Sequence, residues 1–198
     1  VTYIMFAIFM GFGIGMSSVV SRLIGEKRTE DIRRVTTHGL AMVVIASLIF
    51  SALGLALMNP LFRAMGADQA AMGLIDDYMN IYFIGTLFIC LPIVGNAAIR
   101  AGGDTTVPAV IMCTAALTNA IIDPFLIFGL FGLPRLELQG AAISTVFSNA
   151  CAMLAGLYVL KSRDMISSHY LRDLSALGDS AKRLLFIAIP AGLTSALP

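Results

Sequence analysis

Asp123 is the only charged residue between Asp104 and Arg135, in a stretch of otherwise mostly apolar residues. Pro124 follows it directly, and Asn119 precedes it by one helical turn. A carboxylate inside a lipid bilayer costs several kcal/mol, and ionisable residues kept at such a cost usually bind or relay ions. If this stretch crosses a bilayer, these residues predict a cation-binding site.

Two interpretations of Asp123 follow from its neighbours. In the first, its carboxyl group is satisfied by Asn119 or Thr145 and only holds helices together. In the second, which we favour, Asp123 takes up a cation. Pro124 removes an amide donor, frees the carbonyl group of Ala120 and bends the helix. A bend beside an ion-binding group is a plausible two-state element.

The composition is that of a membrane protein. Of 198 residues, 58% are hydrophobic and 13% are charged, whereas a soluble domain has about 45–50% apolar and about 25% charged residues. Charge-poor runs that reach the roughly 20 residues needed to span a bilayer recur along the chain. They predict helices over about 1–21, 35–60, 77–99, 105–131 and 138–161. The sequence therefore predicts an all-α, polytopic helical membrane protein.

The cations are distributed unequally between the ends of these helices. If 22–34 is cytoplasmic, alternation places every Lys and Arg except Arg63 and Arg135 on the inside. The positive-inside rule then orients the first helix from outside to inside. We expect 162–183 to be a charged cytoplasmic connection with an amphipathic helix along the membrane surface, and 184–198 to begin another helix.

Because the chain starts and stops inside apolar runs, we expect it to be a piece of a longer protein.

Several short motifs follow one another in a specific order. They are GIGMSSVVSRLIGEK at 13–27, a helix opening Tyr78-x-x-Ile81, RAGGDTTVP at 100–108, TNAIIDPFLIFG at 118–129, LQGAAIST at 138–145 and LLFIAIPAGL at 184–193. Over nearly the whole chain, their order and spacing resemble the multidrug and toxic compound extrusion (MATE) transporters.

This resemblance implies a protein of twelve helices in two lobes. Residues 1–161 correspond to helices two to six, most of the N-terminal lobe. Residues 162–183 then connect the lobes on the cytoplasmic side, and 184–198 begin the first helix of the C-terminal lobe. Members of that family are secondary active exporters. They antiport organic, often cationic, compounds against H⁺ or Na⁺ by alternating access.

The resemblance also implies a cation site in the outer half of the N-terminal lobe. Many prokaryotic members use an Asn and an Asp one turn apart, a Thr on the next helix and often a Tyr. The corresponding residues here are Asn119, Asp123, Thr145 and Tyr78, with Pro124 as the helix bend. An Asp on helix one completes the site in that family, and this chain lacks the matching segment.

The same resemblance sets the expected partners. The coupling ion is H⁺ or Na⁺, no cofactor is expected, and no metal is expected beyond Na⁺ at Asp123. The substrates are drugs or toxic organic compounds, and the surroundings are the lipid bilayer of a prokaryotic plasma or inner membrane. The net charge of +1 does not indicate a nucleic-acid partner. The full-length protein is expected to be monomeric.

Two other functions are compatible with a polytopic chain. A lipid-linked saccharide flippase of the same superfamily would need cations inside its cavity to hold a diphosphate, and we expect none on these helices. An intramembrane enzyme would need clustered His, Asp or Glu residues, or a Ser–His pair. His38 and His169 lie near or beyond the inner ends of predicted helices, far in depth from Asp123. An exporter is therefore the preferred interpretation.

Overall fold

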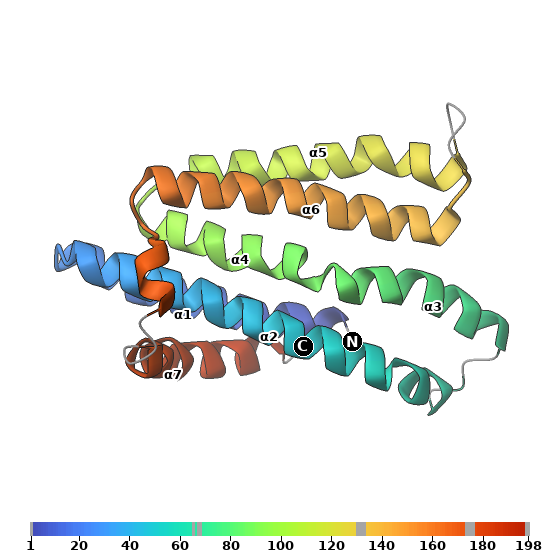
Figure 1. Cartoon of the computed structure of the whole chain (residues 1–198), viewed down its shortest axis with the longest axis horizontal. Helices are drawn as coiled ribbons and strands as arrows, with labels where there is room; N and C mark the ends of the chain where they lie inside the picture. Colours follow the sequence, from blue (N-terminus) through green and yellow to red (C-terminus); the bar gives the residue numbers. More distant parts are fainter. Residues whose placement is uncertain (1, 65, 67–68, 130–133, 173–176, 197–198) are drawn as a thin grey trace.

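The protein is a bundle of long helices. The computed structural model describes residues 2–64, 66, 69–129, 134–172 and 177–196, and Figure 1 shows most of the helices running along the long axis of the bundle. In chain order the helices are α1 (Thr2–Gly25), α2 (Thr29–Ala64), α3 (Gln69–Ile84), α4 (Thr86–Ala101), α5 (Thr106–Phe128), α6 (Glu137–Ser162), the 3₁₀ helix η2 (Ser168–Arg172) and α7 (Leu177–Ala196). The described chain is all-α, as the sequence predicts.

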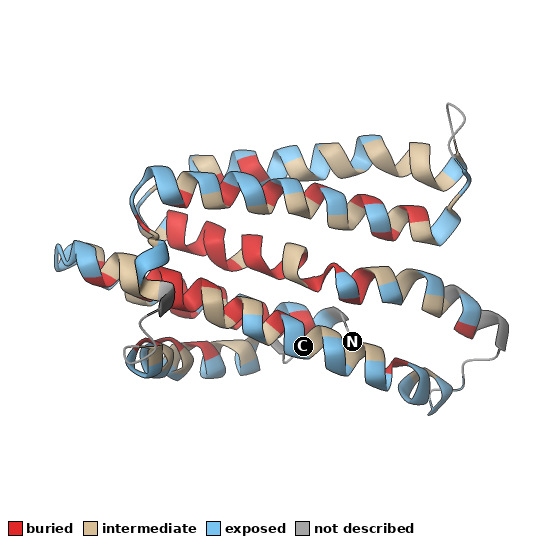
Figure 2. Cartoon of the chain, viewed as in Figure 1, coloured by how far each residue is buried: buried red, intermediate tan, exposed pale blue. Residues whose placement is uncertain are grey.

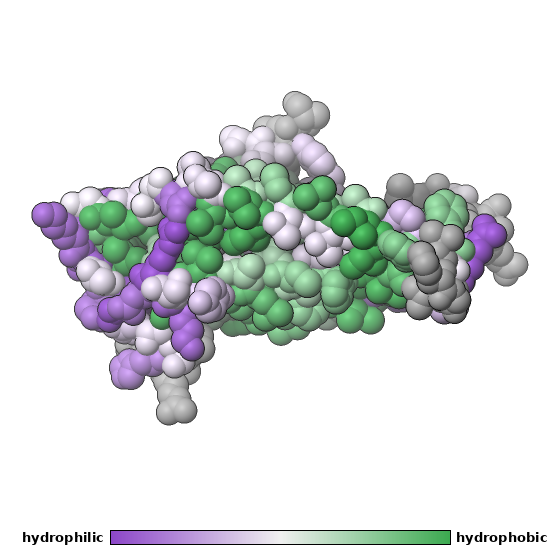
Figure 3. Space-filling view, turned by 90° about the horizontal axis from the view of Figure 1, so that it is seen from above, coloured by the Kyte–Doolittle hydropathy of each residue, from purple (hydrophilic) through white to green (hydrophobic). Residues whose placement is uncertain are grey.

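The surface of the bundle suits a membrane. Within the described chain, four helices, α1, α2, α5 and α6, are each long and apolar enough to cross a bilayer, and the bent pair α3 and α4 forms a fifth candidate span. Large apolar side chains are exposed on the outside, and Figure 3 shows apolar residues mainly over the middle, with hydrophilic residues towards the ends. Lipid offers no polar partners, so an apolar middle is what a spanning bundle requires. The chain is therefore a multi-pass membrane protein.

The prediction of a single helix over 77–99 is wrong. The structure has two helices there, α3 and α4, which meet at a 48° bend around Gly85. Beside the bend, the Thr86 hydroxyl donates to the carbonyl oxygen of Tyr82 at 3.2 Å, which satisfies a backbone acceptor. Gly85 packs on Val146 of α6, where a Cβ would lie 2.1 Å from Val146 Cγ2. Glycine therefore permits both the bend and the close contact, and hydropathy alone does not reveal either.

The second helix is longer than the predicted 35–60, because α2 includes charged residues assigned to the preceding loop. Arg34 pairs with Asp31 at 2.5 Å, and Arg33 pairs with Glu30 at 3.2 Å, each about one turn apart. Acidic residues in a first turn also stabilise the N-terminal end of a helix. Local charge pairs thus extend α2 beyond its apolar run.

The connection predicted over 162–183 is not a single amphipathic helix. α6 ends at Ser162, residues 163–167 are not helical, and the short η2 follows. α7 begins at Leu177, earlier than the predicted 184, and residues 173–176 lie outside the described chain. The division of the chain into a lobe, a connection and a second lobe stays a prediction.

The remaining helices start and end within a few residues of prediction, although 130–131 lie outside the described chain. Asp104 caps α5, since its Oδ1 accepts from the backbone N–H groups of Thr106 at 2.9 Å and Val107 at 3.0 Å. Its other carboxylate oxygen pairs with Arg163, just after α6. The hydrogen bond from this guanidinium holds the pKa of the Asp104 carboxyl below its usual value. One ionised carboxylate therefore joins an end of α5 to an end of α6.

α4 lies at the centre of the bundle. It contacts α1, α2 and α6, and Figure 2 shows it as the segment where buried residues are concentrated. The buried polar residues Thr86 and Asn96 of this helix therefore face other helices and not lipid.

α1 and α7 pack with their backbones in contact. A Cβ on Gly11 would lie 2.5 Å from the carbonyl oxygen of Ala188, and a Cβ on Gly15 would lie 2.9 Å from that of Leu184. Gly192 on α7 faces Gly11 in the same contact. Small residues four apart allow such close approach, which strengthens van der Waals packing between helices in lipid.

We expect Gly11→Ala to lower the free energy of unfolding of the intact protein by about 1–3 kcal/mol, the usual cost of overpacking. The added methyl group would overlap the α7 backbone. The measurement is SDS titration in mixed micelles, followed by circular dichroism. Gly73→Ala on α3 is the control, because no atom lies within 4 Å of its added Cβ. Equal stability of Gly11→Ala and the wild type would contradict the contact.

Candidate functional site

The C-terminal half of α5 packs directly on the start of α6. A Cβ on Gly140 of α6 would lie 2.7 Å from the carbonyl carbon of Leu126. The backbone N–H of Leu136 donates to the Leu126 oxygen at 3.0 Å, which joins the two segments near the same point. Backbones this close place side chains that face each other within hydrogen-bond reach.

Four side chains meet across this contact. The Ser144 hydroxyl of α6 donates to Oδ1 of Asp123 and accepts from Nδ2 of Asn119 at 2.7 Å. The same Asn119 nitrogen lies 3.5 Å from Thr145 Oγ1. We call Asn119, Asp123, Ser144 and Thr145 the Asp123 network. The structure thus brings together three of the four residues that the sequence singled out for the site.

Ser144 is the member that the sequence analysis missed. It is fully buried and bridges the two α5 side chains, whereas the Thr145 hydroxyl donates to the Ala141 oxygen of its own helix at 2.9 Å. The available signal was the run of small polar residues at the start of α6. Successive residues point about 100° apart around a helix, so only the packing shows which of them faces Asp123.

Tyr78 lies on α3 beside the network but outside its hydrogen bonds. Its ring stacks on that of Tyr82, with the centroids 5.8 Å apart. α5 continues through Pro124 to Phe128, so the proline does not end the helix. A role of Tyr78 in ion binding and a functional bend at Pro124 stay predictions.

The chemistry of the network suits a proton or a hard cation. It offers a carboxylate together with hydroxyl and amide oxygens, the ligand types that hard cations prefer. Among the described residues, no three His, Cys, Asp or Glu side chains come together in a way that could hold a metal ion. The network could therefore bind H⁺ or Na⁺ through oxygen atoms.

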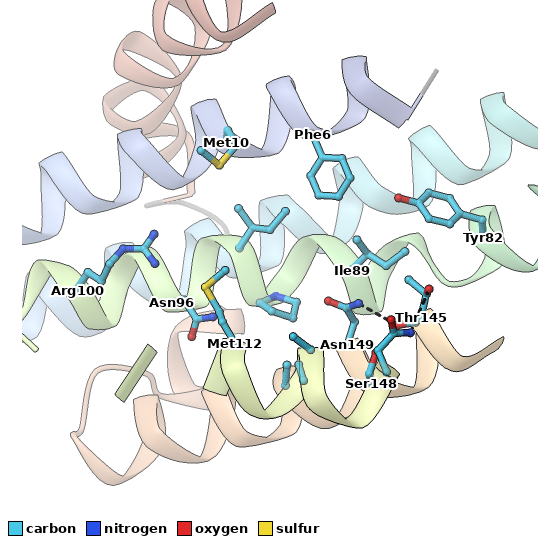
Figure 4. A pocket seen from close by; sticks show the side chains of 16 residues that line it. Phe6, Met10, Tyr82, Ile89, Asn96, Arg100, Met112, Thr145, Ser148 and Asn149 are labelled. Carbon is cyan, nitrogen blue, oxygen red and sulfur yellow. Dashed lines mark hydrogen bonds between the residues drawn. The ribbon is translucent and has the colours of Figure 1, made fainter. Parts of the chain in front are cut away.

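A cavity of about 580 Å³ lies next to the network, between α1, α5, α6 and the bent α3–α4 segment. Figure 4 shows apolar side chains such as Phe6 and Met10 on its α1 side. Its polar uncharged lining consists of Asn96, Asn119, Thr145, Ser148 and Asn149. Asn119 and Thr145 therefore belong both to the cavity wall and to the Asp123 network.

Two residues of α4 give the cavity a polarity that the sequence analysis did not predict. Asn96 is only 3% exposed, and its Oδ1 has no hydrogen-bond partner within the described structure, although buried polar atoms are normally paired. Arg100 lines the cavity at the end away from Thr145 (Figure 4). The expectation that no cation lines this cavity is therefore wrong. The prediction failed because the apolar run stops at residue 99, whereas α4 continues to Ala101 and therefore includes Arg100.

Comparison with known proteins gives consistent matches. The family model described as MatE matches residues 1–125. A protein named FAD transporter, from Shewanella oneidensis, is 40% identical over 98% of this chain, and multidrug export protein MepA from Staphylococcus aureus is 28% identical over 97%. The crystal structure of the Vibrio cholerae MATE transporter VcmN in the bent form matches 99% of this chain with a TM-score of 0.90 and 26% identity. The chain spans 43% of the length of each of these proteins.

We expect Ser144→Ala to lower the free energy of unfolding of the intact protein by about 1–3 kcal/mol, the cost of leaving buried polar groups without a partner. The substitution removes the only bridge that the described structure shows between Asn119 and Asp123. SDS titration in mixed micelles measures the difference.

Ser148→Ala is the matched control for this substitution. Ser148 is also buried on α6, but its hydroxyl donates to the Thr145 oxygen of its own helix at 3.1 Å. If both variants lowered the free energy of unfolding equally, the bridge between α5 and α6 would contribute no more stability than the hydrogen bond of any other buried serine.

Proposed function

Because this chain belongs to the MATE family of transporters, we propose that it forms part of a secondary active exporter of small organic molecules, driven by H⁺ or Na⁺. The family's members are transporters and not enzymes, so the intramembrane enzyme considered above is excluded. The exporter would lie in a prokaryotic plasma or inner membrane and act as a monomer. Its substrates would be drugs or other toxic organic compounds, many of them cationic.

One observation carries this proposal: Asn119 and Thr145 are shared between the cavity and the network around Asp123. An exchanger must make the occupancy of its ion site depend on the occupancy of its substrate site. Side chains that contact both sites provide that dependence directly. Any ion that rearranges the hydrogen bonds of Asp123 also changes the cavity wall.

The proposed cycle begins with the cavity open to the outside. A proton on Asp123 removes its charge and adds an O–H donor, which competes with Asn119 for the oxygen atom of Ser144. Na⁺ would instead draw the oxygens of Asp123, Ser144 and Thr145 around itself. Either change moves Asn119 or Thr145 at the cavity wall and weakens the hold on the substrate. The ion then leaves from the inward-facing state.

The membrane potential can supply the energy for this exchange. Each elementary charge that crosses 100 mV releases about 2.3 kcal/mol. That energy supports about a fiftyfold gradient of a neutral substrate at one-to-one exchange. For a neutral substrate, a single coupling ion is therefore sufficient for useful export.

In the intact transporter, we expect Asp123→Asn to abolish substrate-driven exchange of H⁺ or Na⁺, because the amide removes the titratable, anionic group. The measurement is ion flux across proteoliposomes after addition of ethidium. Asp77→Asn is the control, since Asp77 is an exposed carboxylate of α3 that accepts from Gln139 Nε2 at 2.8 Å and takes no part in the hydrogen bonds of the network. Exchange by Asp123→Asn at the wild-type rate would overturn the assignment of Asp123.

Arg100 favours a second candidate substrate, FAD. The 40% identical relative from Shewanella oneidensis is named for that cofactor, which combines aromatic rings with a diphosphate. The cavity presents aromatic side chains, Phe6 and Tyr82, together with the guanidinium of Arg100. Guanidinium groups bind phosphate oxygens through paired, charge-assisted hydrogen bonds. A lipid-linked saccharide flippase would use the same contact, and it stays the alternative.

We expect Arg100→Gln to reduce FAD export by the intact transporter by about tenfold or more, the effect of losing a hydrogen bond to a charged group. Ethidium export should be unchanged, because a cation does not bind the guanidinium. Loss of FAD from preloaded vesicles measures the effect. Lys161→Gln, which removes an exposed cation near the end of α6, is the control. FAD export that is absent in the wild type, or equal in wild type and Arg100→Gln, would exclude this candidate.

A further inference from the structure

A second groove lies where the end of α1 meets the start of α7. It has a volume of about 620 Å³, and both helices and the turn after α1 contribute to its walls. Its charged residues are Arg22, Glu26, Arg28, Lys182 and Arg183, and its apolar residues are Val19, Leu23, Phe186 and Ile187. Figure 1 shows the end of α1 and the start of α7 at the same end of the bundle. We call this feature the inner groove.

The inner groove is layered by depth. On α7, Lys182 and Arg183 come about one helical turn before Phe186, which lies further into the apolar part of the bundle. α1 runs antiparallel to α7, as the facing of Gly11 with Gly192 and of Gly15 with Leu184 requires. On α1, Val19 precedes Arg22 and is therefore also deeper, whereas Leu23 follows Arg22 and is level with the cations. The cations form a rim, and Val19, Phe186 and Ile187 form the apolar wall beneath it.

The rim has an excess of positive charge. Arg22 donates to Glu26 at 2.9 Å, and this bond lowers the pKa of Glu26, which therefore stays ionised and offsets one cation. Arg28 pairs with a carboxylate of α2 at 2.5 Å. Within the described chain, no carboxylate pairs with Lys182 or Arg183. Asp179, about one turn earlier on α7, forms no ion pair with either of them in the described structure, so both cations can bind an anion.

We propose that the inner groove binds an anionic phospholipid, with its phosphate at Lys182 and Arg183 and an acyl chain along Phe186. The excess of cations at this end of the helices is what the positive-inside rule assigns to the cytoplasmic leaflet. Basic pockets between transmembrane helices on that side hold anionic headgroups. The inference requires a membrane-embedded chain but does not depend on the role of Asp123 or on the substrate.

A lipid matches this groove better than a soluble phosphate does. The ring of Phe186 lines the groove directly beside the cationic rim. A soluble anion would contact the rim and leave that ring uncovered, whereas a phospholipid covers both layers at once. A lipid bound here would also contact α1 and α7 together, and so stabilise the glycine-based packing between them.

The experiment measures lipid retention by the intact protein in native mass spectrometry. The purified protein is mixed with equal amounts of phosphatidylglycerol and phosphatidylcholine, which differ in net charge but share the phosphate and acyl chains. We expect preferential retention of phosphatidylglycerol and a higher melting temperature with it. Lys182→Gln/Arg183→Gln should reduce this retention about thirtyfold, the usual combined effect of two cations near an anionic headgroup.

Lys27→Gln/Lys161→Gln is the matched control, because it removes two exposed cations that do not line the groove. Arg22→Gln provides a second test that leaves α7 unchanged, and it should reduce retention less than the double variant does. The proposal is wrong if phosphatidylcholine is retained equally, or if the control loses as much phosphatidylglycerol as the double variant. It is also wrong if glycerol phosphate without acyl chains raises the melting temperature as much as the lipid does.

Discussion

The structure depends on a single constraint, which is that lipid supplies no hydrogen-bond partner to Asp123. The partners must therefore come from a neighbouring helix, held close enough and at the correct rotation. Gly140 provides the closeness, because it lets the α6 backbone touch α5 at Leu126. Ser144 provides the partner, one turn further along α6, with its hydroxyl bonded to the carboxylate. The need of Asp123 in α5 for a hydrogen-bond partner is thus met by a glycine and a serine of α6.

Close backbone contacts recur wherever the bundle needs precise helix positions. The α1–α7 contact uses Gly11 and Gly15, and the bend between α3 and α4 uses Gly85 against Val146. Without a hydrophobic driving force between helices in lipid, such contacts provide much of the packing energy. The bent α3–α4 segment in turn directs Asn96 and Arg100 of α4 to the cavity. Packing therefore determines the polarity of the cavity.

The charged end of the bundle is held by side chains and not by apolar packing alone. Arg33 of α2 pairs with Asp164, and the Ser167 backbone N–H donates to Thr37 Oγ1 at 3.1 Å. His38, which is fully buried, lies 3.0 Å from the Ser180 hydroxyl of α7 through its Nδ1. These contacts join α2, the segment after α6 and α7. Residues that appear to be a solvated charged loop in the sequence thus include structural contacts.

The sequence by itself determined the all-α class, the apolar spans and the one-turn spacing of Asn119 and Asp123, because hydropathy and helical periodicity are properties of neighbouring residues. The tertiary structure alone decided that Ser144 bridges those residues and that Arg100 lines the cavity. It also decided that one predicted span bends at Gly85. Each of these depends on the rotation and distance of helices that are remote along the chain. That information lies in side-chain packing between helices, which no local pattern encodes.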